Sequence, residues 1–524
     1  MSPILQLDQF LSNNPDIEMF EVLLHDLNGA QRGKWLPRDK IYKLFEGGFK
    51  MPLSSCSLDC WGRDQEELIS ATGDTDGICV PDASTLVRVP WGDKPTAQVI
   101  VSMTDEGSGE PYLGDCRAVL QNILSRFKVL GLTPVVASEM EFHLLKIDPD
   151  KFGVPRHTQT SIDGSPSIGG QTYGIDTMRD SAGLMDAIID AAKTQNLPVD
   201  TLITEFGPSQ FEINLYHQNC ALRACDQGSM LKRAIRSVAH QHDKLATFMA
   251  KPFADQVGNG MHIHFSLLDQ DGKNVFDNGT SEGSELLNNA VAGCLSTMAD
   301  SMAIFAPNIN SYRRMVPGCY APLSPNWGYE NRTTAVRIPG GDYRAMRIEH
   351  RVAGADANPY LTVATILAGA LWGIERSLKA PNAIIGDAGD VVPSLPQFWN
   401  DALHAFEDSV FVRTMLGSEL QVNYARCKRQ EKHEFDRQAH QLHSLGGVSR
   451  FFAVEPAIGI TGIDGTKSAG SGAHVAHQHD RGGARAPAFA NIGTLGLLTD
   501  RRQTMLVNNR PDRVKLGTAL YPHS

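Results

Sequence analysis

Side chains that could carry chemistry recur at alternate positions in four short segments of the sequence. The segments present Glu139, Glu141 and His143; Glu212 and Asn214; His262, His264 and Ser266; and Arg347, Glu349 and Arg351. Because successive side chains of a strand point to opposite faces, this alternation predicts four strands with one charged face and one apolar face. Solvated faces are rich in Lys and Thr, whereas these faces offer Glu, His and Arg, which favours a site.

The acidic residues and one histidine form a set that suits a hard divalent cation. The set is Glu139, Glu141, Glu205, Glu212, Glu349 and His262. Carboxylate oxygens with a single imidazole match Mg²⁺ or Mn²⁺ better than zinc, which prefers Cys or several His ligands. We therefore expect a magnesium or manganese site on the charged faces.

Arginines close to these segments could hold an anionic substrate. They are Arg314, Arg332, Arg337, Arg347 and Arg351. A guanidinium binds phosphate or carboxylate oxygens through two parallel hydrogen bonds, so metals and arginines on one face indicate phosphoryl transfer. A Walker A loop is absent, since the segment from Gly465 to Ser468 has the wrong spacing.

Helices and apolar strands must position these faces. Residues 115–130 predict a helix, with Asp115 as N-cap and Gly131 as its end. Asn358 and Pro359 predict the start of a second helix, and residues 19–24 and 96–103 predict strands of a smaller, sheet-containing domain.

Composition narrows the class of protein further. The chain has 524 residues, a formal net charge of −11 and 42% hydrophobic residues. A negative balance argues against nucleic-acid binding. The N-terminus predicts no signal peptide, the near-apolar run Leu361–Ile374 is too short to cross a membrane, and nine cysteines form no disulfide framework. We expect a cytoplasmic protein that binds neither nucleic acid nor membrane.

Six sequence blocks in a fixed order resemble the glutamine synthetase superfamily over roughly residues 15–437. They begin at Glu139, Glu205, Gly258, Asn310, Asn331 and Arg347, the last being followed by Asn358-Pro-Tyr-Leu. The resemblance implies an α+β fold with an N-terminal β-grasp domain and a barrel-like catalytic domain. We place these domains at 1–107 and 108–445, and a Gly-rich tail, with nine basic and five acidic residues, at 446–524. It also implies a homo-oligomer, commonly a dodecamer of two hexameric rings, with active sites between subunits.

Matched positions in the superfamily imply a role for each candidate residue. One metal site falls to Glu141, Glu205 and Glu212, and the second to Glu139, His262 and Glu349. Gly258, Arg314 and Arg351 match residues that hold glutamate, Arg332, Arg337 and Arg347 match residues that hold the phosphates of ATP, and Ser266 lies near the nucleotide base. The implied reaction converts L-glutamate to γ-glutamyl phosphate, which an amine then attacks.

One position departs from the ammonium-using enzymes. They carry a glutamate six residues after the glutamate-binding arginine, where this chain has Tyr320. An aromatic wall can contact the carbon of an alkylammonium and attract its charge. With Tyr320 at this position, the chain resembles the γ-glutamyl-amine ligases, which use polyamines or monoamines. We expect Arg314, Arg332, Arg351 and Tyr320 to take part in the reaction itself.

Alternatives remain at this stage. The chain could be a glutamine synthetase that uses ammonium, or a non-catalytic structural or regulatory relative. Asp59 and Glu330 are candidates for the base that deprotonates the amine. His143 is expected to be structural, His264 to lie beside the metal ligands or nucleotide, and Cys319 to be a small wall residue with no activating partner.

Overall fold

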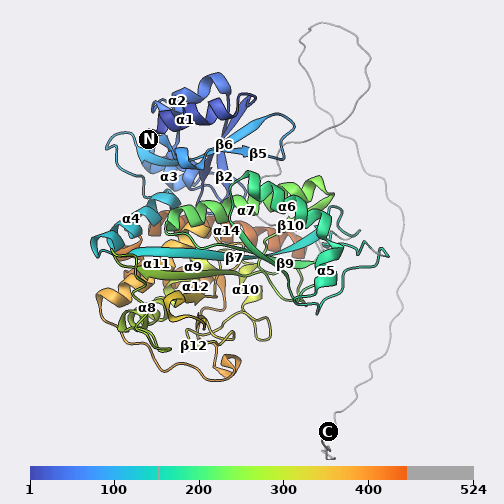
Figure 1. Ribbon diagram of the computed structural model, residues 1–524, viewed down its shortest axis with the longest axis vertical. Coiled ribbons are helices and arrows are strands. Elements are labelled where there is room, and N and C mark those ends of the chain that lie inside the picture. Colours follow the sequence, from blue (N-terminus) through green and yellow to red (C-terminus); the bar gives the residue numbers. More distant parts are fainter. Residues whose placement is uncertain (152, 162, 445–524) are drawn as a thin grey trace, which may run out of the picture. The chain divides into compact units, whose positions relative to one another are not determined.

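The computed structural model describes residues 1–151, 153–161 and 163–444, and Figure 1 shows two sheets with helices packed against them. The segment predicted as a tail, 446–524, lies outside the described residues. None of the described helices has both the length and the apolar character needed to span a bilayer. The α and β elements are mixed along the chain, as the sequence predicts.

The N-terminal sheet has strand order β2-β1-β6-β4-β3, with β5 paired to β6. Its strands are β1 (Met19–His25), β2 (Gln31–Pro37), β3 (Lys50–Pro52), β4 (Asp76–Pro81), β5 (Val87–Val89) and β6 (Thr96–Asp105). The two apolar segments expected to be strands are β1 and β6, which run parallel to each other in the centre of the sheet. Helices α1 (Pro3–Asn13), α2 (Ile41–Phe45) and α3 (Glu66–Thr72) accompany this sheet.

The larger sheet follows the order β12-β13-β14-β11-β7-β9-β8, with β10 paired to β7. Its strands are β7 (Thr133–Lys146), β8 (Val199–Thr204), β9 (Gln210–Leu215), β10 (Lys244–Thr247), β11 (Met261–Leu268), β12 (Trp327–Tyr329), β13 (Val336–Ile338) and β14 (Ile348–His350). All four segments with the alternating pattern therefore lie in one sheet, as β7, β9, β11 and β14.

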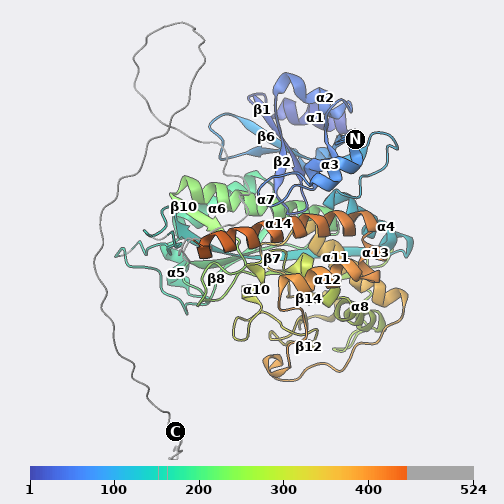
Figure 2. The same cartoon turned by 180° about the vertical axis from the view of Figure 1, so that it is seen from behind.

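Helices connect the strands of this sheet and pack against it (Figures 1 and 2). They are α4 (Cys116–Val129), α5 (Ile175–Asp180), α6 (Ala182–Thr194), α7 (Ala221–Gln241), α8 (Glu285–Ser296), α9 (Met302–Phe305), α10 (Ser311–Arg314), α11 (Pro359–Glu375), α12 (Trp399–Asp408), α13 (Val410–Met415) and α14 (Ser418–Ser444).

Both strongly predicted helices form where their capping residues indicate. The Asp115 side chain accepts a hydrogen bond from the backbone N–H of Arg117 at the start of α4. Asn358 accepts from the N–H groups of Tyr360 and Leu361 at the start of α11, and Pro359 occupies the first turn. These side chains satisfy backbone donors that a helix leaves unpaired, so they fix where each helix begins.

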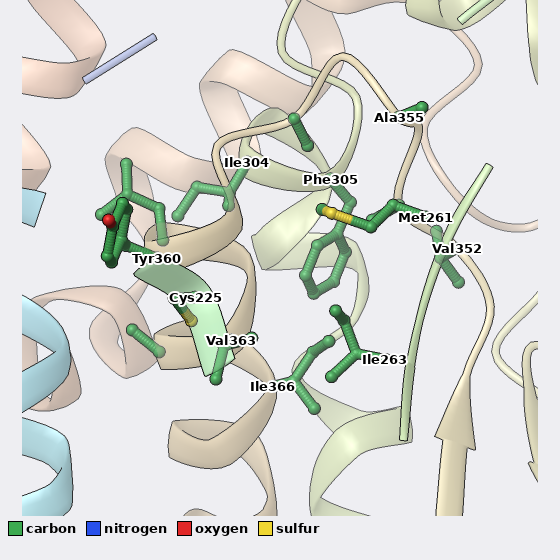
Figure 3. Close-up of a cluster of buried hydrophobic side chains, with 14 of the residues drawn as sticks. Cys225, Met261, Ile263, Ile304, Phe305, Val352, Ala355, Tyr360, Val363 and Ile366 are labelled. Carbon is green, nitrogen blue, oxygen red and sulfur yellow. The ribbon is translucent and has the colours of Figure 1, made fainter. Parts of the chain in front are cut away.

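The apolar face of the larger sheet packs on a buried helix layer. Figure 3 shows Met261 and Ile263 of β11 beside Val363 and Ile366 of α11, all of them in one buried cluster. Because these residues alternate with His262 and His264, burying one face of β11 turns both histidines toward the opposite face. Removing a large side chain from such a cluster costs about 2–5 kcal/mol.

Helices α8 and α11 approach unusually closely. A Cβ atom built on Gly293 would lie 2.1 Å from the Gly369 carbonyl oxygen. Only glycine permits this approach, which sets the depth at which α11 lies behind the sheet. The position of α11 in turn supports β11 and the side chains that β11 carries.

Candidate active site

Strand register places the acidic side chains next to one another. Glu139 on β7 lies opposite His262 on β11 and Asn214 on β9. Glu141 lies opposite Glu212 on β9. Side chains of directly opposed residues on one face are close enough to interact. The alternation predicted from the sequence thus becomes one continuous charged surface.

Glu139 is held by two histidines. Its carboxylate oxygens lie 3.1 Å from Nδ1 of His262 and 2.9 Å from Nε2 of His264. Burial alone would raise the pKa of Glu139, but these hydrogen bonds outweigh burial and lower it. Glu139 is therefore kept as an anion.

His264 has a defined tautomer in this arrangement. The Arg347 Nε–H group lies 3.2 Å from Nδ1 of His264 and can only donate, so Nδ1 accepts. The proton is then on Nε2, which donates to Glu139. His264 therefore orients the Glu139 carboxylate through this hydrogen bond.

Glu349 lies between two arginines. Its Oε2 accepts a hydrogen bond from Arg337 at 2.8 Å, and its Oε1 accepts another from Arg351. Burial raises the pKa of Glu349, but the positive charge of Arg351, helped by His262, lowers it to about 2. Oε1 of Glu349 also lies 3.8 Å from Nδ1 of His262, which joins this group to Glu139.

Glu205 and Glu212 are in the opposite electrostatic situation. Burial and the nearby charge of Glu141 raise the pKa of Glu205 to about 7. Burial and the charge of Glu139 raise the pKa of Glu212 well above its ordinary value. Carboxyl groups that are buried close together ionise less readily, because their negative charges repel one another, and a bound cation removes this penalty.

The donor set fits a divalent cation. Ligand atoms of Glu139, Glu212 and His262 lie within 4.8 Å of one another, and so do those of Glu139, His264 and Glu349. The donors are carboxylate oxygens with imidazole nitrogen, and the crowded carboxylates lack enough positive charge nearby. These are the conditions under which Mg²⁺ or Mn²⁺ binds.

Gly258 and Arg314 form a tight contact at the end of this surface. A Cβ atom on Gly258 would lie 2.1 Å from the Ala250 carbonyl oxygen and 3.1 Å from Cγ of Arg314. The guanidinium of Arg314 is anchored by a 2.8 Å hydrogen bond from Nη1 to the Val352 carbonyl oxygen. Residue 258 must therefore be glycine for Arg314 to reach the acidic group.

A buried polar network supports this corner, and the sequence did not single it out. Gln210 Nε2 donates to the Gly258 carbonyl oxygen at 2.9 Å, and Gln210 Oε1 accepts from the Gly207 N–H. Asn259 Oδ1 accepts from Gln210 and contacts Nδ1 of His143 at 2.8 Å. His143 is fully buried and contacts this network through Nδ1. The signal in the sequence is that His143 and Gln210 share the polar phase of β7 and β9.

A cavity of about 860 Å³ opens beside the acidic group. Glu139, His264, Ser266, Arg344 and Arg347 are among the residues that line it. Its walls carry both positive charge and hydrogen-bonding groups, and its volume suits a nucleotide. Ser266 and Arg347, the two candidate nucleotide contacts that line this cavity, lie in one place.

Arg332 lies apart from the other arginines of the site. Its side chain is exposed, whereas Arg337 and Arg351 are engaged with Glu349. Its positive charge offsets a small part of the rise in the pKa of Glu205, which indicates that the guanidinium is near this carboxyl group. Arg332 is therefore free to contact a substrate.

An exposed aromatic pair stands next to Glu205. The ring centroids of Tyr320 and Phe206 are 6.0 Å apart, and the side chains are 74% and 48% exposed. Phe206 directly follows Glu205 in the sequence, a position from which it could have been predicted. The pair presents two exposed aromatic faces beside the acidic group, and such faces can attract a cation.

The two candidate bases differ in availability. Asp59 is buried, and its carboxylate oxygens accept from Trp61 N, Arg63 N and the Arg63 guanidinium. Glu330 is 62% exposed and lies 3.9 Å from Nη2 of Arg337. Within the described chain, Asp59 serves structure and Glu330 lies at the edge of the site.

Cys319, expected to be a small wall residue with no activating partner, has one hydrogen-bond contact with a charged side chain. The Lys251 ammonium group donates a hydrogen bond to its Sγ atom at 2.9 Å. The two residues are far apart in the sequence, so only the tertiary structure reveals this pair.

Comparisons with known proteins agree with this geometry. Residues 113–444 match the family model described as glutamine synthetase, catalytic domain. The chain is 38% identical to gamma-glutamylputrescine synthetase PuuA of Escherichia coli strain K12 over 436 residues, which are 82% of this chain and 92% of the relative. It is 33% identical to glutamate–isopropylamine ligase of a Pseudomonas species, over 68% of this chain and 78% of the relative.

A solved structure gives the same result for the fold. The structure described as a GmaS/ADP complex superposes with a TM-score of 0.71 and 26% identity, over 82% of this chain and 96% of that one. The chain belongs to the glutamine synthetase family. Both the predicted family and the predicted glutamine-synthetase-like fold are thereby confirmed.

Proposed function

We propose that this protein is an ATP-dependent ligase that joins the γ-carboxylate of L-glutamate to an organic amine. The observation that carries the proposal is a complete acidic and arginine surface combined with the aromatic pair Phe206 and Tyr320. The first feature supports phosphoryl transfer, and the second supports an acceptor that contains carbon. Relatives named for putrescine and isopropylamine ligation support the same substrate class.

We assign two metal positions from the residues that match the family, and the two ligand groups of the structure share Glu139, Glu212, His262 and Glu349 with them. Glu141, Glu205 and Glu212 would hold one Mg²⁺ or Mn²⁺, and Glu139, His262 and Glu349 the other. When bound, these ions neutralise phosphate oxygens in the transition state. Glu139 and Glu349 have lowered pKa values and are ready ligands at neutral pH.

The protein's own side chains would align the substrates. Ser266 and Arg347 contact ATP in the cavity, and Arg332 and Arg337 bind its phosphates. Gly258, Arg314 and Arg351 hold glutamate so that a γ-carboxylate oxygen attacks the γ-phosphorus and ADP leaves. Fixing both reactants in this way lowers the entropic part of the barrier.

The amine then attacks the γ-carbonyl carbon, and phosphate leaves with the oxygen that it received. Tyr320 and Phe206 contact the carbon chain and attract the ammonium form through their rings. The bound ammonium loses one proton before it attacks, and we assign the removal of this proton to Glu330, whose carboxylate is exposed near Arg337. The nitrogen loses a second proton when the amide forms, and the departing phosphate can take it.

We further propose that the active protein is a homo-oligomer, with two hexameric rings as its form, and that it works in the cytoplasm. Large apolar side chains such as Trp35, Ile175 and Ile385 are exposed on the single chain, which supports association. The described cysteines are all free, which supports a reducing compartment. Light scattering after size-exclusion chromatography measures the number of subunits.

The function is tested by ADP release with ATP, glutamate and Mg²⁺ or Mn²⁺, across ammonium, putrescine, spermidine, ethanolamine, isopropylamine and aniline. We expect turnover with an organic amine and little with ammonium. Ammonium as the best acceptor would identify a glutamine synthetase instead. Inactivity with every acceptor would favour a non-catalytic relative.

Tyr320 is tested separately by Tyr320→Glu, with Tyr320→Phe as the matched control. The glutamate variant should move preference toward ammonium by about tenfold, because it exchanges an aromatic wall for an anionic one. The phenylalanine variant keeps the ring and should keep the preference for amines. An unchanged ratio in both variants would contradict the role of Tyr320.

A further inference from the structure

A buried lysine touches the loop that carries Tyr320. Lys251 is 4% exposed, and its ammonium group donates to the Gln256 carbonyl oxygen and to Sγ of Cys319. In the described part of the chain it has these two acceptors and no carboxylate partner. Burying an ammonium group is costly, so these two hydrogen bonds are needed to hold it.

The loop that receives this contact has a sequence-encoded shape. The N–H of Cys319 donates to the Val316 carbonyl oxygen at 3.3 Å, and Gly318 has φ +80°. Pro317 and Gly318 at the two central positions are typical of a type II turn. Tyr320 follows with φ +56°, an uncommon conformation for a residue with a side chain.

Tyr320 has little packing of its own. Its side chain is 74% exposed, and its ring packs against the half-exposed ring of Phe206. The location of the Tyr320 ring is therefore set by the backbone of its loop. The contact between Lys251 and Cys319 is one residue away from that backbone.

The other end of Lys251 is fixed to the glutamate-binding corner. Asn310 receives the Lys251 N–H at 2.8 Å and donates to the Lys251 carbonyl oxygen at 3.0 Å. Asn310 is the N-cap residue of α10, which carries Arg314. The segment after Lys251 leads through Gln256 to Gly258, so the lysine joins the turn to both residues of that corner.

We propose that Lys251 is a positioning residue that sets the distance between the aromatic acceptor wall and the glutamate-binding corner. It acts through Cys319 on Tyr320 and through Asn310 and Gln256 on Arg314 and Gly258. This inference rests on the proposed function for its kinetic consequence. Its structural consequence, a fixed 316–320 loop, is independent of which acceptor is used.

The first test compares the wild-type protein with Lys251→Met, which keeps the chain length and removes the donor. The KM for the preferred amine should rise about tenfold, the effect of losing one charge-assisted hydrogen bond. The KM for ATP should change less than about twofold, because the cavity is formed by other segments. Cys319→Ala should act in the same direction, and Cys319→Ser, which restores an acceptor, should recover the wild-type value.

A second measurement does not need activity. Hydrogen exchange in Lys251→Met should become faster in peptides that cover residues 316–320 and stay unchanged in β11. Lys232→Met is the matched control, since Lys232 is also buried and caps the carbonyl groups of Ala355 and Ala357. That control should leave exchange at 316–320 unchanged.

The outcomes separate the two proposals. If the wild-type protein uses no amine but Lys251→Met still loosens residues 316–320, the positioning role stands and the proposed function fails. If the wild-type protein ligates amines and Lys251→Met changes neither the amine KM nor exchange at 316–320, the positioning role is wrong. Faster exchange throughout the chain would also overturn it, because that result indicates general destabilisation.

Discussion

Two buried groups of charged side chains in this chain differ in how far their charges are balanced by neighbouring residues. On α14, Lys428 and Glu431 are fully buried and lie 2.9 Å apart, and the Glu431 carboxylate also accepts from Asn28 and the Cys60 N–H. In the active site, Glu205 and Glu212 crowd together with other carboxylates and have raised pKa values. The first group satisfies its charges within the chain, and the second leaves a deficit of positive charge.

This difference in charge balance distinguishes a group that stabilises the fold from a group that is suited to bind a cation. The α14 cluster joins the last described helix to Asn28 and Cys60 of the N-terminal region, so its hydrogen bonds hold distant segments together. The carboxylates of the site repel one another in the absence of a cation, which stores unfavourable energy that metal binding releases. Four predictions test this contrast.

The largest effect is expected at the satisfied cluster. Lys428→Met leaves the Glu431 carboxylate buried without its counter-ion and should lower the free energy of unfolding by about 3–5 kcal/mol. Urea denaturation followed by circular dichroism measures this loss. A loss below about 1 kcal/mol would mean that the cluster does not hold the segments together.

The double variant Lys428→Met with Glu431→Leu is the matched control for that experiment. It replaces both charges by apolar groups and should recover much of the lost stability, since no uncompensated charge remains.

In the active site, we expect that removing a carboxyl group does not lower the stability of the metal-free protein. Glu212→Gln replaces a buried carboxyl group whose ionisation burial and Glu139 disfavour, and should leave the metal-free protein as stable as the wild type or more stable. It should weaken Mg²⁺ binding by about 100-fold, because a ligand oxygen and a charge are lost. Isothermal titration calorimetry measures the affinity, and Glu330→Gln, at the edge of the site, provides a control that keeps it.

Metal addition should stabilise the wild-type protein. A cation that binds only the folded state at 100 times its Kd adds about 2.7 kcal/mol to the free energy of unfolding. The melting temperature should therefore rise when Mg²⁺ is added and fall again with a chelator. The Glu212→Gln variant should show a smaller rise at the same concentration, and an equal rise would place the stabilising ion elsewhere.

The smallest effect is the pH dependence of metal binding. Protons compete with the cation for Glu205, whose pKa is raised to about 7. Mg²⁺ affinity should fall by up to about tenfold per unit as the pH drops below about 7, and protonation of Glu212, whose pKa is also raised, adds to this fall. Calorimetry between pH 5.5 and 8.5 measures the slope, and Glu205→Gln should flatten it near pH 7.

Features of this fold that depend on interactions between residues close in the sequence could be predicted, and features that depend on contacts between distant segments could not. Asp115 and Asn358 mark the starts of α4 and α11 because capping is local. The strands that carry Glu139, Glu212, His262 and Glu349 were predictable because burial of one face enforces alternation. The register that puts Glu141 opposite Glu212 was not predictable, since it depends on how separate strands pair.

Phe206 and Gln210 had sequence signals that could have been used, the position after Glu205 and the polar phase of β9. Lys251 had none, and it gains its place through a contact with a residue distant along the chain. Cys319 was expected to have no activating partner, and its contact with Lys251 could not be predicted from local patterns. Its partner is brought to it by a loop that lies 68 residues earlier in the chain.

The sequence by itself determined the family, the types of ligand and which face of each strand carries them, because composition, alternation and capping act over a few residues. Only the tertiary structure decided which carboxylates repel, which are neutralised by Arg337 and Arg351, and how Tyr320 is held. The physical reason is that charge and hydrogen bonding depend on distances between segments that only packing brings together.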